Sequence, residues 1–210
     1  MEILKQMAES LERGEHRRVH ELTRRAIEEK IPPARILEDG LIGGMRVVGD
    51  RFRLREIYLP EVLLAARAMS AGMELLKPLL IEEGIPTLGK VVIGSVRGDL
   101  HDIGKNLVGI MLKGAGFEVI DLGTDVQPQR FIETAVAENA PVIGMSALLT
   151  TTMPAMKEVV DLVKQRGLHP GIKTIVGGAA VSAEFADHIG ADAYAFDAAN
   201  AVQQVKQMIA

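Results

Sequence analysis

The run of glycine, aspartate and histidine at residues 98–106 is the part of this chain best suited to chemistry. Its sequence is GDLHDIGKN, and it follows the apolar run KVVIGSV at residues 90–96. His101 stands between two carboxylates, and its neighbour Asp99 is placed to orient the imidazole. A histidine that binds a metal through one ring nitrogen usually donates its other N–H to a carboxylate. The same pattern also fits a histidine that only caps the next helix, so spacing alone leaves both interpretations open.

This segment lacks the motifs of two common nucleotide-binding loops. Five residues separate Gly98 from Gly104, whereas a phosphate-binding loop has four. Asn106 stands where that loop needs a serine or threonine to hold magnesium. The G-x-G-x-x-G of dinucleotide folds is absent as well. The sequence therefore gives no support to nucleotide hydrolysis or to hydride transfer.

The composition of the 210 residues excludes further classes of protein. The absence of cysteine excludes disulfides, thiolate metal sites and cysteine nucleophiles. A net charge of −4 and an aromatic content of 3% argue against nucleic-acid binding. The N-terminal sequence MEILKQMAESLERGEHRR has no apolar signal core, and no apolar run approaches the roughly 20 residues of a membrane helix. We therefore expect a cytoplasmic protein.

The first part of the chain, residues 1–87, has the pattern of a helical domain. Gly14 and the pair Pro32-Pro33 end two apolar-periodic stretches, and Pro60 stands at the start of another, where its missing N–H does no harm. Short connections between helices favour an antiparallel four-helix bundle. Apolar residues recur at helical spacing near 3–11, 19–27, 36–48 and 60–80.

The second part, residues 88–210, alternates short β-branched runs with helical stretches. A linker at residues 83–89 precedes it. This alternation predicts an α/β domain, a flavodoxin- or Rossmann-like parallel sheet of five strands with helices on both faces. Ligands of such sheets bind beyond the carboxyl ends of the strands. The expected strands are 90–96, 117–123, 141–148, 173–180 and 193–196, and the expected helices are 105–113, 127–139, 152–167, 182–190 and 198–210.

Three short motifs resemble the B12-binding domains of methionine synthase, methylmalonyl-CoA mutase and corrinoid methyl-transfer proteins. Asp99-x-His101-x-x-Gly104 matches the D-x-H-x-x-G of that family, and GDLHDIGKNLVG is particularly similar to methionine synthase and the corrinoid proteins. Ser146-x-Leu148 at the end of the third expected strand matches its S-x-L. Gly177-Gly178 at the end of the fourth matches its G-G. The order and spacing of these motifs also follow the family, and the resemblance covers the whole chain.

The resemblance implies a cobalamin or related corrinoid bound base-off and His-on, with His101 as the axial ligand of cobalt. The lower nucleotide base would then enter a deep slot in the domain, where Ser146 would hydrogen-bond it and Thr150 would lie near it. A relay of Asp99, His101 and Thr152 is implied as well. Ser146 and Thr152 also fit helix caps, and the glycine pair also fits a plain turn. The other residues that the resemblance places at the cofactor are Gly98, Asp102, Ile103, Gly104, Leu148, Gly177 and Gly178.

Phe52 and Leu59 resemble the two apolar residues with which the helical cap of methionine synthase covers the methyl face of the corrin. Their separation of seven is the same. A cap of this kind excludes water and must move before an enzyme reaches the methyl group. Both residues also fit the core of a helical bundle. The sequence departs from the family at Leu54-Arg55-Glu56, where Gly-Glu is frequent, so the local turn is expected to differ.

A helical cap followed by a B12 domain is the layout of the corrinoid proteins of three-component methyltransferase systems. The resemblance implies a carrier that is not catalytic on its own. One methyltransferase would load cobalt with a methyl group from a methylamine, methanol or a methoxylated aromatic. A second would pass it from methyl-cobalt(III) to tetrahydrofolate or coenzyme M, and an ATP-dependent activase would rescue oxidised cobalt. The low asparagine content hints at a thermophilic acetogen and so at an O-demethylase.

Two other functions stay open, and the first of them shares this layout. The first is a light- or B12-sensing regulator, although such proteins usually add a basic DNA-binding domain and often have a tryptophan-rich cap. This chain has no tryptophan and a net negative charge. The second is the B12 subunit of an isomerase, which more often lacks a cap of this kind.

Overall fold

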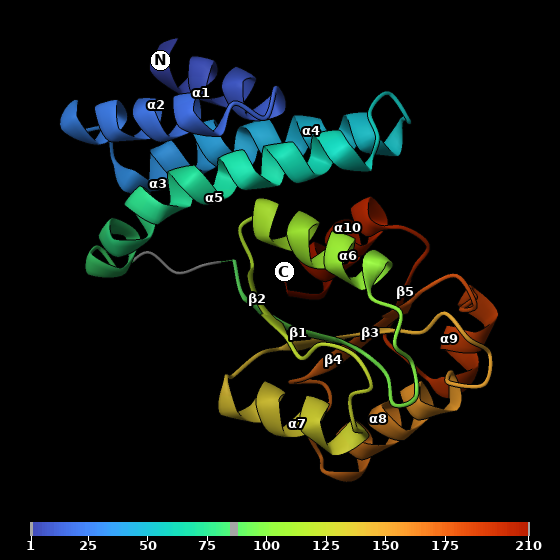
Figure 1. The fold of residues 1–210 in the computed structure, drawn as a ribbon. Coiled ribbons are helices and arrows are strands. Elements are labelled where there is room, and N and C mark those ends of the chain that lie inside the picture. The colour runs from blue at the N-terminus through green and yellow to red at the C-terminus, as the bar shows by residue number, and fades with distance from the viewer. Residues whose placement is uncertain (1, 85–87, 210) are drawn as a thin grey trace. The chain divides into compact units, whose positions relative to one another are not determined.

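The computed structural model describes residues 2–84 and 88–209, which fall into two compact units (Figure 1). The first unit contains the helices that precede residue 85, and the second contains all the strands. Each unit is described by itself. The domain boundary expected between residues 87 and 88 borders residues 85–87, which lie outside the described residues, so it stays a prediction.

In residues 2–84 of the first unit all regular structure is helical, and it falls into four stretches as the apolar periodicity predicts. The third stretch is continuous but changes its helical type, because a π-helical segment, η1, separates α3 from α4. Gly40 lies in this segment, and a Cβ atom there would come within 2.6 Å of Met7 Sδ, so α1 packs closely against it. The helices are α1 (Glu2–Glu12), α2 (His16–Glu28), α3 (Pro33–Arg35), η1 (Ile36–Ile42), α4 (Gly43–Arg53) and α5 (Leu59–Glu82).

The core of this helical unit is aliphatic. Leu22 of α2, Leu41 of η1 and Leu76 of α5 are fully buried, and α2 packs against α5. Helix α5 begins with a capping interaction, in which the Tyr58 backbone N–H donates to Glu61 Oε2 at 3.1 Å. No helix in the described parts of the chain is long and apolar enough to cross a membrane.

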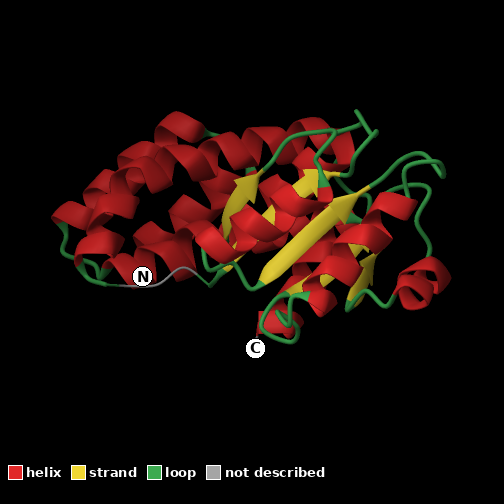
Figure 2. Cartoon of the chain, turned by 90° about the horizontal axis from the view of Figure 1, so that it is seen from below, coloured by secondary structure: helices red, strands yellow, loops and turns green. Residues whose placement is uncertain are grey.

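The second unit is built on a five-stranded, all-parallel sheet with the strand order β2-β1-β3-β4-β5. Figure 2 shows the strands of this sheet in yellow. This order confirms the predicted flavodoxin-like fold, in which the chain reverses its direction of winding between β1 and β3. Ser95, Ser146 and Gly177 are paired across β1, β3 and β4, so the loops that follow these strands begin at the same level. The strands are β1 (Lys90–Ser95), β2 (Glu118–Asp121), β3 (Val142–Ser146), β4 (Lys173–Gly177) and β5 (Ala193–Ala195).

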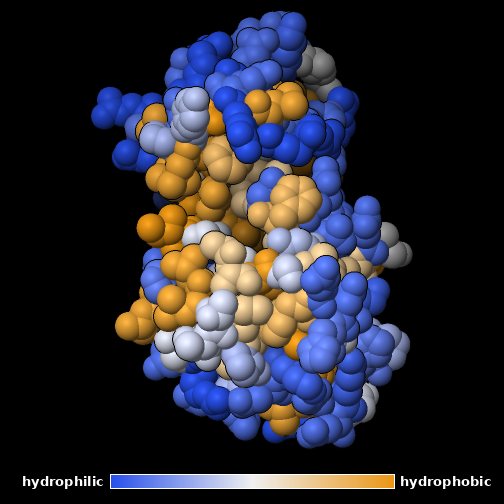
Figure 3. All heavy atoms as spheres, turned by 90° about the vertical axis from the view of Figure 1, so that its right-hand side faces the viewer, coloured by the Kyte–Doolittle hydropathy of each residue, from blue (hydrophilic) through white to orange (hydrophobic). Residues whose placement is uncertain are grey.

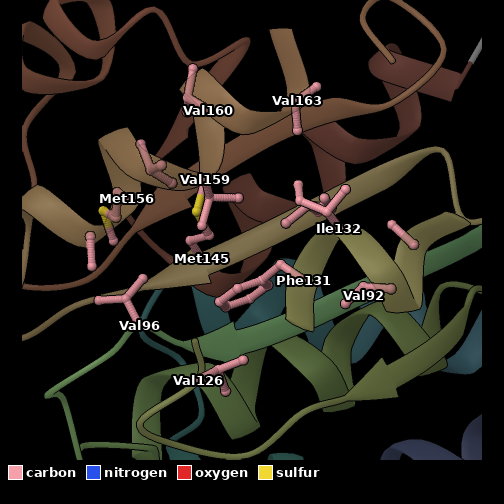
Figure 4. Close-up of a cluster of buried hydrophobic side chains, with 14 of the residues drawn as sticks. Val92, Val96, Val126, Phe131, Ile132, Met145, Met156, Val159, Val160 and Val163 are labelled. Carbon is pink, nitrogen blue, oxygen red and sulfur yellow. The ribbon is translucent and has the colours of Figure 1, made fainter. Parts of the chain in front are cut away.

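Helices cover both faces of this sheet, with α6 and α10 on one face and α7, α8 and α9 on the other (Figure 1). The core between the sheet and the second group centres on Phe131, which packs among valine, isoleucine and methionine side chains (Figure 4). Burial of both sheet faces accounts for the β-branched strands. The helices are α6 (Ile103–Gly114), α7 (Pro128–Ala137), α8 (Pro154–Gln165), α9 (Ala183–Ile189) and α10 (Ala198–Ile209).

Candidate functional site

The loops that leave β1 and β3 meet at the point where the chain reverses its winding. Helices α6 and α8 lie on opposite faces of the sheet, so the two loops diverge after their first residues. Such a divergence is where ligands of parallel sheets bind. The Val96 backbone N–H donates to the Ser146 carbonyl at 3.0 Å and holds the two loops together at their base.

Asp99, in the loop after β1, is completely buried and accepts five hydrogen bonds. Its Oδ1 accepts from the His101 backbone N–H at 3.0 Å and lies 2.9 Å from His101 Nδ1. Its Oδ2 accepts from the backbone N–H groups of Leu148 at 2.8 Å and Leu149 at 3.3 Å, and from Thr152 Oγ1 at 2.8 Å. The carboxylate therefore joins the loop after β1 to the loop after β3.

The pKa of the Asp99 carboxyl lies well below its ordinary value of 3.8. Burial by itself raises this pKa, because it penalises the charged form. Hydrogen bonds from the Leu148 backbone, the Thr152 hydroxyl and the backbone and ring of His101 favour the carboxylate and outweigh burial. Asp99 is therefore ionised at neutral pH.

The ring of His101 is half exposed, and its Nδ1 atom faces the ionised carboxylate of Asp99. An ionised carboxylate only accepts hydrogen bonds, so a neutral imidazole in this position carries its proton on Nδ1. The lone pair then resides on Nε2, the atom that a metal ion would use. The geometry matches that of an oriented metal ligand, whereas the alternative interpretation, a helix cap, would direct the ring to the backbone of α6.

Thr152 adds its hydroxyl to the same carboxylate, and this side chain is buried. Its Oγ1 also lies 2.8 Å from the Leu149 carbonyl, so its single proton has two possible acceptors. Helix α8 begins at Pro154, and the side chain of Thr152 bonds to Asp99 instead of capping that helix. The structure thus brings together the three residues of the expected relay.

The other residues expected at the cofactor lie at the same edge of the sheet. Ser146 ends β3 half-buried, and Leu148 and Thr150 are exposed in the loop after it. Asp102 precedes α6, where its Oδ2 accepts from Asn106 Nδ2 at 3.0 Å. Their contact with a cofactor stays a prediction.

Several large apolar side chains are exposed along this edge. Apolar patches that are exposed in this way often mark a surface that binds a ligand or another protein. Ile103 is 73% exposed and Leu100 is 72% exposed. Figure 3 shows hydrophobic residues gathered on the face of the second unit that carries these loops. We call this group the apolar rim, and its members are Leu100, Ile103, Leu148, Leu149 and Phe196.

Three of the expected glycines are required by the backbone itself, and at one of them, Gly177, a Cβ atom would lie 2.9 Å from the Ala195 carbonyl oxygen. Gly178 has a φ of +117°, and a Cβ atom there would lie 2.1 Å from the Ala147 carbonyl oxygen. Gly98 has a φ of +82°, which side chains rarely adopt. At Gly104 an added Cβ would meet no atom within 4 Å. The close approach of the loops after β3 and β4 therefore explains Gly178 without any ligand.

Lys105 and Asp125 are two residues of this site whose role the sequence did not predict. Lys105 is 4% exposed, and its ammonium donates to Asp121 Oδ1 and to Asn106 Oδ1, both at 2.7 Å. These two acceptors occupy the ammonium, whereas the lysine of a phosphate loop binds phosphate. The contact therefore agrees with the absence of a phosphate-loop motif in the sequence. Asp125 accepts a hydrogen bond from the Gly98 backbone N–H at 2.7 Å. Its position in the loop after the second strand was the one available signal.

Phe52 and Leu59 lie in the first unit, at the end of α4 and the start of α5. Both side chains are half-buried, in contrast to the fully buried Val48 of the bundle core. The turn between these helices places Arg55 in the left-handed region with a φ of +60°, in the segment where the sequence departs from the resembled family. A covering role for Phe52 and Leu59 stays a prediction.

Known proteins resemble this chain over nearly its whole length. Two family models described as "B12 binding domain" match residues 89–206 and 3–77. A dimethylamine corrinoid protein of Methanosarcina acetivorans is 46% identical over 182 residues, 86% of this chain and 85% of the relative. A chain in the crystal structure of the methanol:cobalamin methyltransferase complex MtaBC from Methanosarcina barkeri is 34% identical with a TM-score of 0.89, covering 99% of this chain and 80% of that one. A cobalamin-binding protein from Desulfitobacterium hafniense DCB-2 is 29% identical with a TM-score of 0.80, covering 98% of both chains.

Replacing Asp99 with asparagine should lower the free energy of unfolding of the ligand-free protein by about 1–3 kcal/mol at pH 7, because one of the two acceptor oxygens becomes an NH2 group that faces existing donors. The folded-state pKa of Asp99 is depressed. Its ionisation therefore stabilises the fold fully above the ordinary pKa of 3.8 and progressively less as the pH falls below it. The difference between wild type and Asp99→Asn should shrink as the pH is lowered from 7 towards 3.

Urea unfolding followed by circular dichroism at several pH values measures this difference. The exposed Asp187 of α9 offers a matched control. The Asp187→Asn variant should stay within about 0.5 kcal/mol of wild type at each pH. A difference between wild type and Asp99→Asn that is constant from pH 7 to 3 would contradict the ionised, hydrogen-bonded carboxylate.

Proposed function

This chain belongs to the B12-binding corrinoid proteins of methyltransferase systems, and from that premise we propose that it carries a methyl group on a bound corrinoid between two methyltransferases. The observation that supports this function most directly is the His101 ring. Its Nδ1 is held by a buried carboxylate, and its Nε2 has no hydrogen-bond partner among the described residues at this edge of the sheet. In this proposal Nε2 of His101 would hold the cobalt in place of the cofactor's lower base.

The donor set fits a corrinoid. Neutral imidazole is a common ligand of transition metals, and a carboxylate behind it fixes its tautomer and raises its basicity. The apolar rim suits a large macrocycle, whose faces are mostly apolar. When bound, the cobalt of the corrinoid supplies the chemistry by accepting and then giving up a methyl group.

The protein's own task in this cycle is to hold the ring of His101 so that its Nε2 can bind the metal and let go of it. While Nε2 is bound to cobalt, Asp99 keeps the proton on Nδ1 and fixes the plane of the ring. When Nε2 is released from the metal, the same contact with Asp99 would keep the ring in place. The Thr152 hydroxyl helps to keep Asp99 ionised throughout.

The proposed partners are a substrate:corrinoid methyltransferase, a methyltransferase that uses tetrahydrofolate or coenzyme M, and an ATP-dependent reductive activase. The relative that is 46% identical is a dimethylamine corrinoid protein, whereas the chain of the methanol complex is 34% identical. A methylamine is therefore the first donor to test. The methoxylated aromatics suggested by the composition stay a prediction.

The His101→Ala variant should bind cobalamin at least tenfold more weakly than wild type, because it loses a coordination bond worth more than about 1.4 kcal/mol. Its absorption spectrum in the cobalt(II) state should shift to that of cobalamin without an axial nitrogen. His188, exposed in α9, offers a matched control, and His188→Ala should bind within twofold of wild type. An unchanged spectrum and affinity in His101→Ala would remove His101 as the ligand.

The carrier function itself is tested by methyl transfer with isotope-labelled donors. We expect the cobalamin-loaded protein, once reduced, to gain label from a methylamine:corrinoid methyltransferase and to lose it to a second methyltransferase. Parallel reactions with the methanol and methoxyaromatic systems test the other two donors. A loaded, His-coordinated protein that gains label from none of the three systems would favour the sensor or the isomerase subunit instead.

A further inference from the structure

A third loop, between β2 and α7, forms hydrogen bonds with the backbone that leads to His101. The Gly98 backbone N–H donates to Asp125 Oδ1 at 2.7 Å. The Asp125 backbone N–H in turn donates to the Asp99 carbonyl at 3.0 Å. One residue therefore holds two successive residues of the loop after β1, one through its side chain and the other through its backbone.

This third loop is itself anchored to β1. Val126 is buried and forms a parallel bridge with Val96, and its N–H donates to the Ser95 carbonyl at 3.0 Å. The Ser95 N–H donates to the Gly123 carbonyl at 2.9 Å. The chain is thus anchored to β1 both before and after Asp125, although the side chain of Asp125 is exposed.

The backbone of Asp125 adopts an unusual conformation, with a φ of +53°. Helix C-termini account for the other non-glycine residues with positive φ in the described parts of the chain, because each lies two residues after a helix, where this conformation is common. Asp125 follows a strand, so this explanation does not apply to it. A strained residue that is held beside a functional loop points to a role in that loop. The residues that follow a helix are Lys30, Arg55 and Asn139.

We propose that Asp125 is a positioning residue for His101, a role that rests on the proposed function above. The carboxylate of Asp99 is oriented by the loop after β3, while the backbone of Asp99 is held by Asp125. The ring of His101 depends on both, because Asp99 Oδ1 binds both its backbone N–H and its Nδ1. Asp125 acts through the backbone of Gly98 and Asp99. The position of His101 Nε2 therefore depends on the carboxylate of Asp125.

Two substitutions separate the carboxylate of Asp125 from its backbone conformation. Glycine adopts a φ of +53° without strain, so Asp125→Gly removes the carboxylate and relieves the backbone. Asparagine tolerates the left-handed region and keeps a neutral oxygen acceptor, which is roughly half as strong as a charged one. A positioning role predicts that histidine coordination is strongest in wild type, weaker in Asp125→Asn and weakest in Asp125→Gly. A role limited to shaping the turn predicts that histidine coordination in Asp125→Gly equals or exceeds that of wild type.

The first readout uses the ligand-free protein and is hydrogen exchange of the Gly98 amide by NMR. We expect exchange to accelerate roughly tenfold in Asp125→Gly, the factor that corresponds to a charged hydrogen bond of about 1.4 kcal/mol. Asp125→Asn should show an intermediate acceleration, of about threefold. The second readout uses the cobalamin-loaded protein at pH 7. The equilibrium constant for histidine coordination, measured by absorption in the cobalt(II) state, should fall in the same order.

The outcomes distinguish this inference from the proposed function. Histidine coordination in Asp125→Gly equal to that of wild type would overturn the positioning role, whether or not Gly98 exchange changes. Wild-type protein without histidine coordination would instead overturn the proposed function and this inference with it. If Asp125→Gly fails to fold, Asp125→Asn carries the test, and its coordination must then lie below that of wild type.

Discussion

The buried carboxylate of Asp99 is the interaction on which the rest of the site depends. Among residues 2–84 and 88–209 it has no lysine or arginine partner, and its charge is balanced by the dipoles of backbone N–H groups, a hydroxyl and an imidazole. An unpaired charge in a protein interior is costly unless donors of this kind surround it. The donors come from two loops, so any shift of one loop relative to the other exposes the carboxylate to that cost. The orientation of the His101 ring is thereby coupled to the register of β1 and β3.

The sheet explains why this carboxylate and this histidine lie where a ligand can reach them. Parallel strands bring their carboxyl ends to one edge, and the loops after β1 and β3 part there because their helices cover opposite faces. Asp99 lies at the bottom of this divergence, whereas the half-exposed His101 ring and the apolar rim lie at its surface. The same edge thus combines a rigidly held, buried carboxylate with an accessible nitrogen. A nitrogen that is to bind a metal and let go of it repeatedly, as proposed for Nε2, requires both properties.

The sequence predicted the fold well because each of its signals is local. Alternation of β-branched runs and amphipathic stretches does not depend on tertiary context, and Gly14, Pro32 and Pro60 mark helix ends directly. The change to π-helix around Gly40 depends on close packing against α1, so periodicity alone gave no sign of it. The strand order β2-β1-β3-β4-β5 was not predicted, because alternation fixes the architecture and not the neighbours of each strand.

The site was predictable where its residues are close in sequence and much less so where they meet through space. The Asp99–His101 pair follows from spacing, but Thr152 lies 53 residues from Asp99 and was found only through the resemblance. Asp125 acts on the backbone of another loop, and Lys105 binds a residue at the end of β2. The sequence gave no sign of either contact beyond the position of Asp125 in the loop after the second strand. Gly178 is a case where the resemblance suggested room for a cofactor and the structure adds a close backbone approach.

The central claim is that Nε2 of His101 binds the cobalt of a corrinoid in place of its lower base. Electron paramagnetic resonance of the cobalt(II) protein tests it directly, with protein that is labelled with ¹⁵N only in its histidines and loaded with unlabelled cobalamin. A bound histidine nitrogen changes the superhyperfine splitting of each cobalt line from the triplet of ¹⁴N to the doublet of ¹⁵N, and we expect the doublet. A triplet that persists in the labelled protein would show that the cofactor's own base remains on cobalt and would contradict the account.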